Sequence, residues 1–168
     1  MIKRKIVSVL IILIAFVLQT TVFQALKLAD VVPNLLLILT VCYGYLRGRT
    51  SGLIVGLFCG LMLDMQYGSV IGLYAFICMT IGFVIGFCQK IYFTDSLLLP
   101  ALLIFGSDFI YGIYYYVTEF LVRARTNFGF YFLHRILPEM VYTVIVGILV
   151  YRFVAMTERL LNKKREEV

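Results

Sequence analysis

Two carboxylates stand inside apolar stretches of this 168-residue chain, where an ionisable side chain is costly and therefore marks a candidate functional site. Asp108 falls near the midpoint of a long apolar run, and Asp64 ends a glycine-rich run. A carboxyl group in such a place can relay a proton or an ion, contact a partner protein, or form a hydrogen bond between helices. We favour the hydrogen bond for Asp108, with Thr80, Thr143 or Gln19 as its partner.

The remaining reactive side chains do not form a catalytic or metal-binding pattern. The single histidine, His134, lies at a loop edge, where an interfacial role is expected. Glu119 and Glu139 each lie four residues from an arginine, so we interpret both as members of local ion pairs. The cysteines lie in apolar segments without metal-type spacing, namely Cys42, Cys59, Cys78 and Cys88. The sequence therefore predicts no enzyme activity, no metal and no cofactor.

Glycines recur at every fourth residue from Gly44 to Gly60, and the same interval continues through Asp64 to Gly68 and Gly72. Each glycine inside a helix costs about 1 kcal/mol relative to alanine. In a membrane protein the glycines can nevertheless be favourable, because membrane helices associate where small residues let their backbones approach closely. We therefore predict contacts with another helix, or with a partner, at Gly52, Gly56, Gly60, Asp64 and Asp108.

The composition indicates that transmembrane helices position the candidate glycines and carboxylates. The chain is 62% hydrophobic with a mean hydropathy of +1.01, which is typical of an integral membrane protein. Its length suits five or six spans with short loops and leaves no room for a soluble domain. We predict one all-α membrane domain over residues 1–168, with about six transmembrane helices at 6–26, 33–46, 50–66, 70–87, 97–122 and 136–155.

Polar residues at the span ends complete the set of candidate sites. Gln19 lies in the polar outer half of the first span and needs a partner on another helix. Pro33 and Asn34 open the second span, where a proline is tolerated because the first backbone N–H groups of a helix are unpaired. The secondary candidates for contact are Gln19, Pro33, Asn34, Glu119 and Glu139.

The basic residues predict the orientation in the membrane. With six spans and a cytoplasmic N-terminus, four of the lysines and arginines lie outside, Lys27, Arg123, Arg125 and Arg135, and the other eleven lie inside. Both termini are therefore expected in the cytoplasm. The net charge of +6 is explained by this distribution, and no nucleic-acid motif accompanies it. The tail from Glu158 to Val168 is either a partner contact or a solvated end on anionic lipid.

The order of these motifs resembles the bacterial rod shape-determining protein MreD family. The resemblance rests on Gln19, Pro33-Asn34, the run from Gly52 to Asp64 with Gly68 and Gly72, Asp108 and Glu119, and Leu137-Pro138-Glu139. It implies a multi-pass protein of the bacterial inner membrane and a scaffold role in cell-wall elongation. The partners that it implies are MreC, and through MreC the actin-like MreB, the glycosyltransferase RodA and a class B penicillin-binding transpeptidase.

A second family remains as the alternative. MreD-like proteins resemble, in size and six-helix build, the substrate-binding subunits of energy-coupling-factor vitamin transporters. Those subunits dock their transporter through an alanine-x-x-x-alanine pattern, which the spacing of Ala15 and Ala25 does not match. Aromatic residues near the outer surface leave a substrate pocket open as a hypothesis, namely Tyr114, Tyr115, Tyr116 and Phe130.

Overall fold

A computed structural model describes residues 2–25, 31–67, 72–91, 97–117 and 136–166, and within them the chain is helical with no β-strand. The helices are α1 (Ile2–Thr20), α2 (Val22–Ala25), α3 (Leu35–Arg47), α4 (Arg49–Tyr67), α5 (Leu73–Ile85), the 3-10 helix η1 (Gly86–Ile91), α6 (Leu98–Tyr116) and α8 (Leu137–Glu166). The all-helical class predicted from the sequence is confirmed.

Three of these helices are long and apolar enough to cross a membrane, over Ile6–Ala25, Leu98–Tyr116 and Leu137–Leu160. Two shorter apolar helices cover Leu35–Arg47 and Leu73–Gln89. At about 1.5 Å per residue, the 13 residues of α3 reach only about 20 Å, against a hydrocarbon core of about 30 Å. The number of complete crossings, six by the sequence interpretation, therefore stays a prediction.

The helix bounds differ from the predicted spans at several places. Helix α1 begins at Ile2 rather than at residue 6, and α5 ends at Ile85, where η1 follows. Helix α3 begins at Leu35 rather than at Pro33, because Asn34 is its N-cap and Pro33 lies before the cap. Helix α8 continues to Glu166, eleven residues beyond the predicted end of the last span. Its final turns contain leucine, lysine, arginine and glutamate, which are good helix formers, so the end of the apolar run is not the end of the helix.

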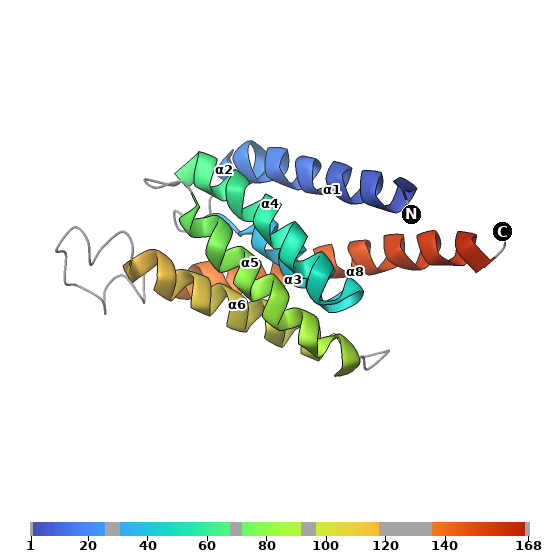
Figure 1. The fold of residues 1–168 in the computed structure, drawn as a ribbon. Helices are drawn as coiled ribbons and strands as arrows, with labels where there is room; N and C mark the ends of the chain where they lie inside the picture. Colours follow the sequence, from blue (N-terminus) through green and yellow to red (C-terminus); the bar gives the residue numbers. More distant parts are fainter. Residues whose placement is uncertain (1, 26–30, 68–71, 92–96, 118–135, 167–168) are drawn as a thin grey trace.

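The helices run back and forth along one axis, and α1 begins at the same end of the bundle at which α8 ends (Figure 1). Helix α3 lies in the middle, and every residue from Leu35 to Tyr45 is buried. A helix that is apolar all round is stable only when other helices surround it. Here α3 contacts α1, α4, α5, α6 and α8, so it forms the centre of the bundle.

The outer faces of the bundle are apolar as well. Helix α1 exposes one such face, formed by Ile6, Val9, Leu10, Leu13, Ile14 and Val17. Exposed leucine and valine at this density are unusual on a protein surrounded by water but ordinary against lipid tails. The bundle is therefore a membrane domain whose perimeter is available to lipid or to the helices of other proteins.

Candidate functional site

The glycines of α4 face the backbone of α5. A Cβ atom added at Gly56 would lie 2.8 Å from the carbonyl carbon of Cys78 and closer still to its carbonyl oxygen. A Cβ atom at Gly60 would lie 2.8 Å from the backbone nitrogen of Ala75, and closer to the Ala75 Cα. Real Cβ atoms essentially never come within 3.0 Å of such neighbours. These two helices therefore approach at a distance that no larger residue permits.

The same close packing extends to α3. A Cβ atom at Gly52 would meet the Gly82 carbonyl group and lie 2.8 Å from the Gly44 Cα, and one at Gly44 would lie 2.8 Å from the Gly82 carbonyl oxygen. Glycines from α3, α4 and α5 thus meet at one point. Gly48 is not part of this helix face: it has a φ of 91° and is the single residue between α3 and α4. Gly68 lies outside the described residues.

Asp64 caps the start of α5 from the end of α4. Its carboxylate oxygens accept hydrogen bonds from the backbone N–H groups of Gly72 at 3.0 Å, Tyr74 at 2.9 Å and Ala75 at 3.0 Å. The side chain is 2% exposed. The first N–H groups of a helix have no partner within the helix, and none can be left unpaired in lipid. Asp64 satisfies this requirement for these three N–H groups, at the end of α5 where the helix dipole is positive.

The start of α3 is capped by side chains from three places in the sequence. Gln19 of α1 accepts a hydrogen bond from the Leu36 N–H at 3.2 Å, and the Asn34 side chain accepts one from the Leu37 N–H at 3.1 Å. The Asn34 N–H donates to the hydroxyl group of Thr143, on α8, at 3.5 Å. Gln19, Asn34 and Thr143 are all buried. This network allows α3 to begin inside the bundle although water does not reach it.

Asp108 lies on the buried face of α6 and is 2% exposed. Neither of its carboxylate oxygens has a hydrogen-bond partner among the described residues. Of the three partners expected from the sequence, Thr143 is close enough to interact with the carboxyl group without forming a bond of ordinary geometry. Thr80 instead donates to the carbonyl group of its own helix, and Gln19 is used at α3. Among the three expected partners, only Thr143 therefore lies beside Asp108, and Thr143 also belongs to the polar network at the start of α3.

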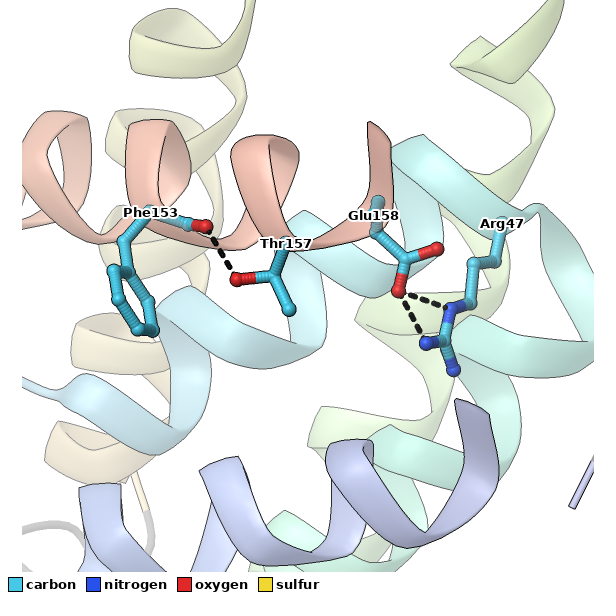
Figure 2. A network of polar contacts seen from close by, with 4 residues as sticks. All are labelled: Arg47, Phe153, Thr157 and Glu158. Atoms are coloured by element: carbon cyan, nitrogen blue, oxygen red, sulfur yellow. Dashed lines mark hydrogen bonds and ion pairs between the residues drawn. The ribbon is translucent and has the colours of Figure 1, made fainter. Parts of the chain in front are cut away.

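An ion pair at the opposite end of α3 was not expected from the sequence. Arg47, the last residue of α3, donates hydrogen bonds from Nε, at 2.9 Å, and from a terminal nitrogen to one carboxylate oxygen of Glu158 on α8 (Figure 2). The two side chains are 11% and 8% exposed. The guanidinium group also lies 4.6 Å from the ring centroid of Tyr43. The only signal in the sequence was a lone glutamate at the start of a basic tail.

Tyrosines fill the region between α5 and α6. The Tyr74 ring lies 5.8 Å from that of Tyr111 and 6.3 Å from those of Tyr114 and Tyr115. The Tyr114 hydroxyl group donates to the Leu73 carbonyl at 3.1 Å. Tyr116 packs instead against Ile136 and Met140. The tyrosines that could have lined a substrate pocket are therefore used here in contacts between helices.

The remaining predicted residues fall at the edges of the structure. Pro33 is buried directly before the N-cap of α3, and Glu139 lies in the first turn of α8, where a negative charge suits the helix dipole. Glu119 and the two arginines expected to pair with these glutamates, Arg123 and Arg135, lie outside the described residues, as do His134 and Phe130. Among the described residues, no three His, Cys, Asp or Glu side chains form a group that could hold a metal ion.

The arrangement joins helices rather than assembling reactive groups. Polar side chains cap the starts of α3 and α5, glycines allow three helices to approach closely, and an ion pair joins the end of α3 to α8. No curated protein matches the chain, and no solved structure does. The model of the family described as rod shape-determining protein MreD matches residues 2–163. The chain therefore belongs to the rod shape-determining protein MreD family.

Proposed function

We propose that this protein is a non-enzymatic scaffold of the cell-wall elongation complex that binds MreC within the membrane. The MreD family is one of bacterial membrane proteins of rod shape determination and is not known as an enzyme family. The observation that carries the proposal is the family match over residues 2–163. Through MreC, the scaffold would contact MreB, RodA and a class B penicillin-binding transpeptidase.

The architecture supports a scaffold role. A scaffold must keep its shape while other proteins bind to its surface. The polar groups of the bundle centre, such as Gln19, Asn34 and Asp64, are used to fix helix ends. The outer faces are broad and apolar, so partners that are themselves membrane helices can reach them.

We further propose that the protein lies in the bacterial inner membrane with both termini in the cytoplasm. The start of α1 and the end of α8 lie at the same end of the bundle (Figure 1), and the basic residues of the sequence are concentrated at the expected cytoplasmic side. In intact cells, a membrane-impermeant thiol reagent should label a cysteine placed at Asn127 but not one placed at Lys164. Labelling at position 164 would contradict this orientation.

The test of the function is depletion of the protein in its rod-shaped host, with cell width and vitamin uptake scored in the same cells. The scaffold role predicts wider, rounded cells with uptake unchanged, together with recovery of MreC when the protein is purified from native membranes. The energy-coupling-factor alternative predicts the reverse, normal width with lost uptake. The expected likeness to those transporter subunits stays a prediction, because no solved structure matched the chain.

A further inference from the structure

The two buried aspartates of the bundle have opposite surroundings, although each is 2% exposed. The Asp64 carboxyl group accepts hydrogen bonds from three backbone N–H groups at 2.9 to 3.0 Å. Neither carboxyl oxygen of Asp108 has a hydrogen-bond partner among the described residues. A buried carboxylate ion is stable only when hydrogen bonds or an opposite charge compensate for the water that it has lost. Asp64 has the donors that an ion needs, and Asp108 does not.

The helices packed against α6 bring no positive charge to the level of Asp108. Helix α6 packs mainly against α8, α3 and α5. Helices α5 and α6 contain no lysine or arginine, and the one arginine of α3, Arg47, lies at the end opposite the Asn34–Thr143 contact. On α8 the first described basic residue after Thr143 is Arg152, nine residues and therefore about 13 Å further along the helix. Among the described residues, an ionised Asp108 would have neither a donor nor a counter-ion.

The ionisable groups that do lie near Asp108 are acidic. Tyr111, about one turn further along α6, is close enough to interact electrostatically with both Asp108 and Glu139. Glu139 lies one turn before Thr143 and is half-buried. Two carboxylates in one apolar region repel each other, so the ionisation of one favours the neutral form of the other. Glu139 is the better anion, because the dipole of α8 favours a negative charge in its first turn.

A neutral Asp108 matches the hydroxyl group beside it. A protonated carboxyl group has one O–H donor, and a threonine hydroxyl oxygen has two lone pairs. The Thr143 oxygen accepts one hydrogen bond, from the Asn34 N–H at 3.5 Å, so a second acceptor position remains for the acid. Asn34 is the N-cap of α3. A hydrogen bond from Asp108 to Thr143 would therefore join α6 to α8 and, through Thr143, to the start of α3.

We propose that Asp108 holds a proton in the assembled bundle and donates it in a hydrogen bond to the hydroxyl oxygen of Thr143. The neutral acid replaces a buried charge without a partner by a polar contact between three helices. Apolar sites that keep a carboxylic acid neutral, so that it can donate a hydrogen bond, are also found in enzymes. The inference goes beyond the scaffold function, since it concerns the interior of the bundle whatever binds outside.

The experiment is infrared spectroscopy of the full-length protein in lipid bilayers at neutral pH, with aspartate isotopically labelled at the side-chain carboxyl carbon. A protonated carboxylic acid gives a carbonyl band apart from the bands of amides and carboxylates, and its shift on labelling assigns it to aspartate. The wild-type protein should show this band, and Asp108→Asn should lose it. The matched control is Asp64→Asn, at an equally buried position, which should keep it.

Two variants of Thr143 test the partner of the acid. Thr143→Val keeps the shape but removes the hydroxyl group, so the band should remain and move to higher frequency as the hydrogen bond is lost. Thr143→Ser restores a hydroxyl group and should restore the frequency. Asp108→Glu serves if Asp108→Asn does not fold: because only aspartate is labelled, the labelled band should disappear although an acid stays at position 108.

Three outcomes would overturn the proposal. A wild-type protein without the acid band would contain an ionised Asp108, as expected for a carboxylate that binds a cation. A labelled band that survives both replacements of Asp108 would place the proton on another aspartate. A band that does not respond to Thr143→Val would exclude Thr143 as the acceptor. None of these outcomes bears on the scaffold role, which the width of depleted cells tests separately.

Discussion

Two single substitutions, Gly56→Ala and Gly106→Ala, distinguish the effect of close helix packing on stability from the effect of helix propensity. Gly56 and Gly106 both lie inside helices, so alanine at either site gains about 1 kcal/mol of propensity. Their surroundings differ: a Cβ atom at Gly106 has nothing within 4 Å, whereas one at Gly56 lies 3.0 Å from the Met79 Cα and closer still to the Cys78 carbonyl group. Gly106→Ala should therefore be stabilising by up to about 1 kcal/mol.

The magnitude at Gly56 follows from the same distances. Ordinary contact begins near 3.4 Å, so α4 and α5 must separate by about 0.5–1 Å, which forfeits a quarter to a half of the dispersion energy of the contacts involved. Overpacking of this kind typically costs about 1–3 kcal/mol. After the propensity gain, Gly56→Ala should be destabilising by up to about 2 kcal/mol. Gly56→Leu should cost more, because a larger side chain cannot be accommodated by a shift of this size.

Thermal unfolding of the two purified variants in one detergent measures the difference. For a chain of this length, 1 kcal/mol corresponds to roughly 2–4 °C, so Gly56→Ala should melt several degrees below Gly106→Ala. The half-exposed neighbour Leu57 supplies a further control, since Leu57→Ala should change the melting temperature less than Gly56→Leu. Equal melting temperatures for the Gly56 and Gly106 alanine variants would refute the claim that the glycines serve close helix packing.

Three further predictions concern the buried polar groups. Asp64→Leu leaves the N–H groups at the start of α5 unpaired and should lower stability by about 2–3 kcal/mol, while Asp64→Asn keeps one acceptor and should lose less; thermal unfolding separates the two. Asp108→Asn should preserve protein level and rod shape, whereas Asp108→Leu should not, and equal damage by both would show that the charge itself is required. Glu158→Ala leaves Arg47 buried without its partner and should destabilise by about 3–5 kcal/mol, with Glu158→Gln costing less.

The sequence predicts a structural role most reliably where a residue type in a given pattern has one common physical explanation. Glycines at intervals of four inside an apolar run have few explanations other than close packing in lipid. The burial of α3 also follows from its sequence, because no face from Leu35 to Tyr45 is polar enough for water. What the pattern could not give was the neighbour: only the fold shows that Gly56 meets Cys78 and that Gly52 meets both Gly82 and Gly44.

The polar contacts were harder to predict, because each depends on residues far apart in the chain. Arg47 and Glu158 are 111 residues apart, and Asn34 and Thr143 are 109 apart. Charge counting uses Arg47 to predict the orientation and places Glu158 in the tail, which predicts their side of the membrane but not their contact. The sequence predicts a contact with another helix or with a partner at Asp64, yet its use as a cap depends on where the fold places Gly72, Tyr74 and Ala75.

The length of α3 connects these contacts. A helix of 13 residues is too short to reach both surfaces of a hydrocarbon core of about 30 Å, so the backbone groups of at least one end would be unpaired without side-chain partners. Its start is closed by Gln19 and Asn34, and its end is joined to α8 by Arg47. Helix α8 contacts both ends of α3, through Thr143 at its start and Glu158 at its end. These two contacts fix the direction of α8 relative to the centre of the bundle. A membrane helix of another protein that packs on the bundle would therefore meet a surface whose position is set before binding, and little conformational freedom would be lost when the two associate.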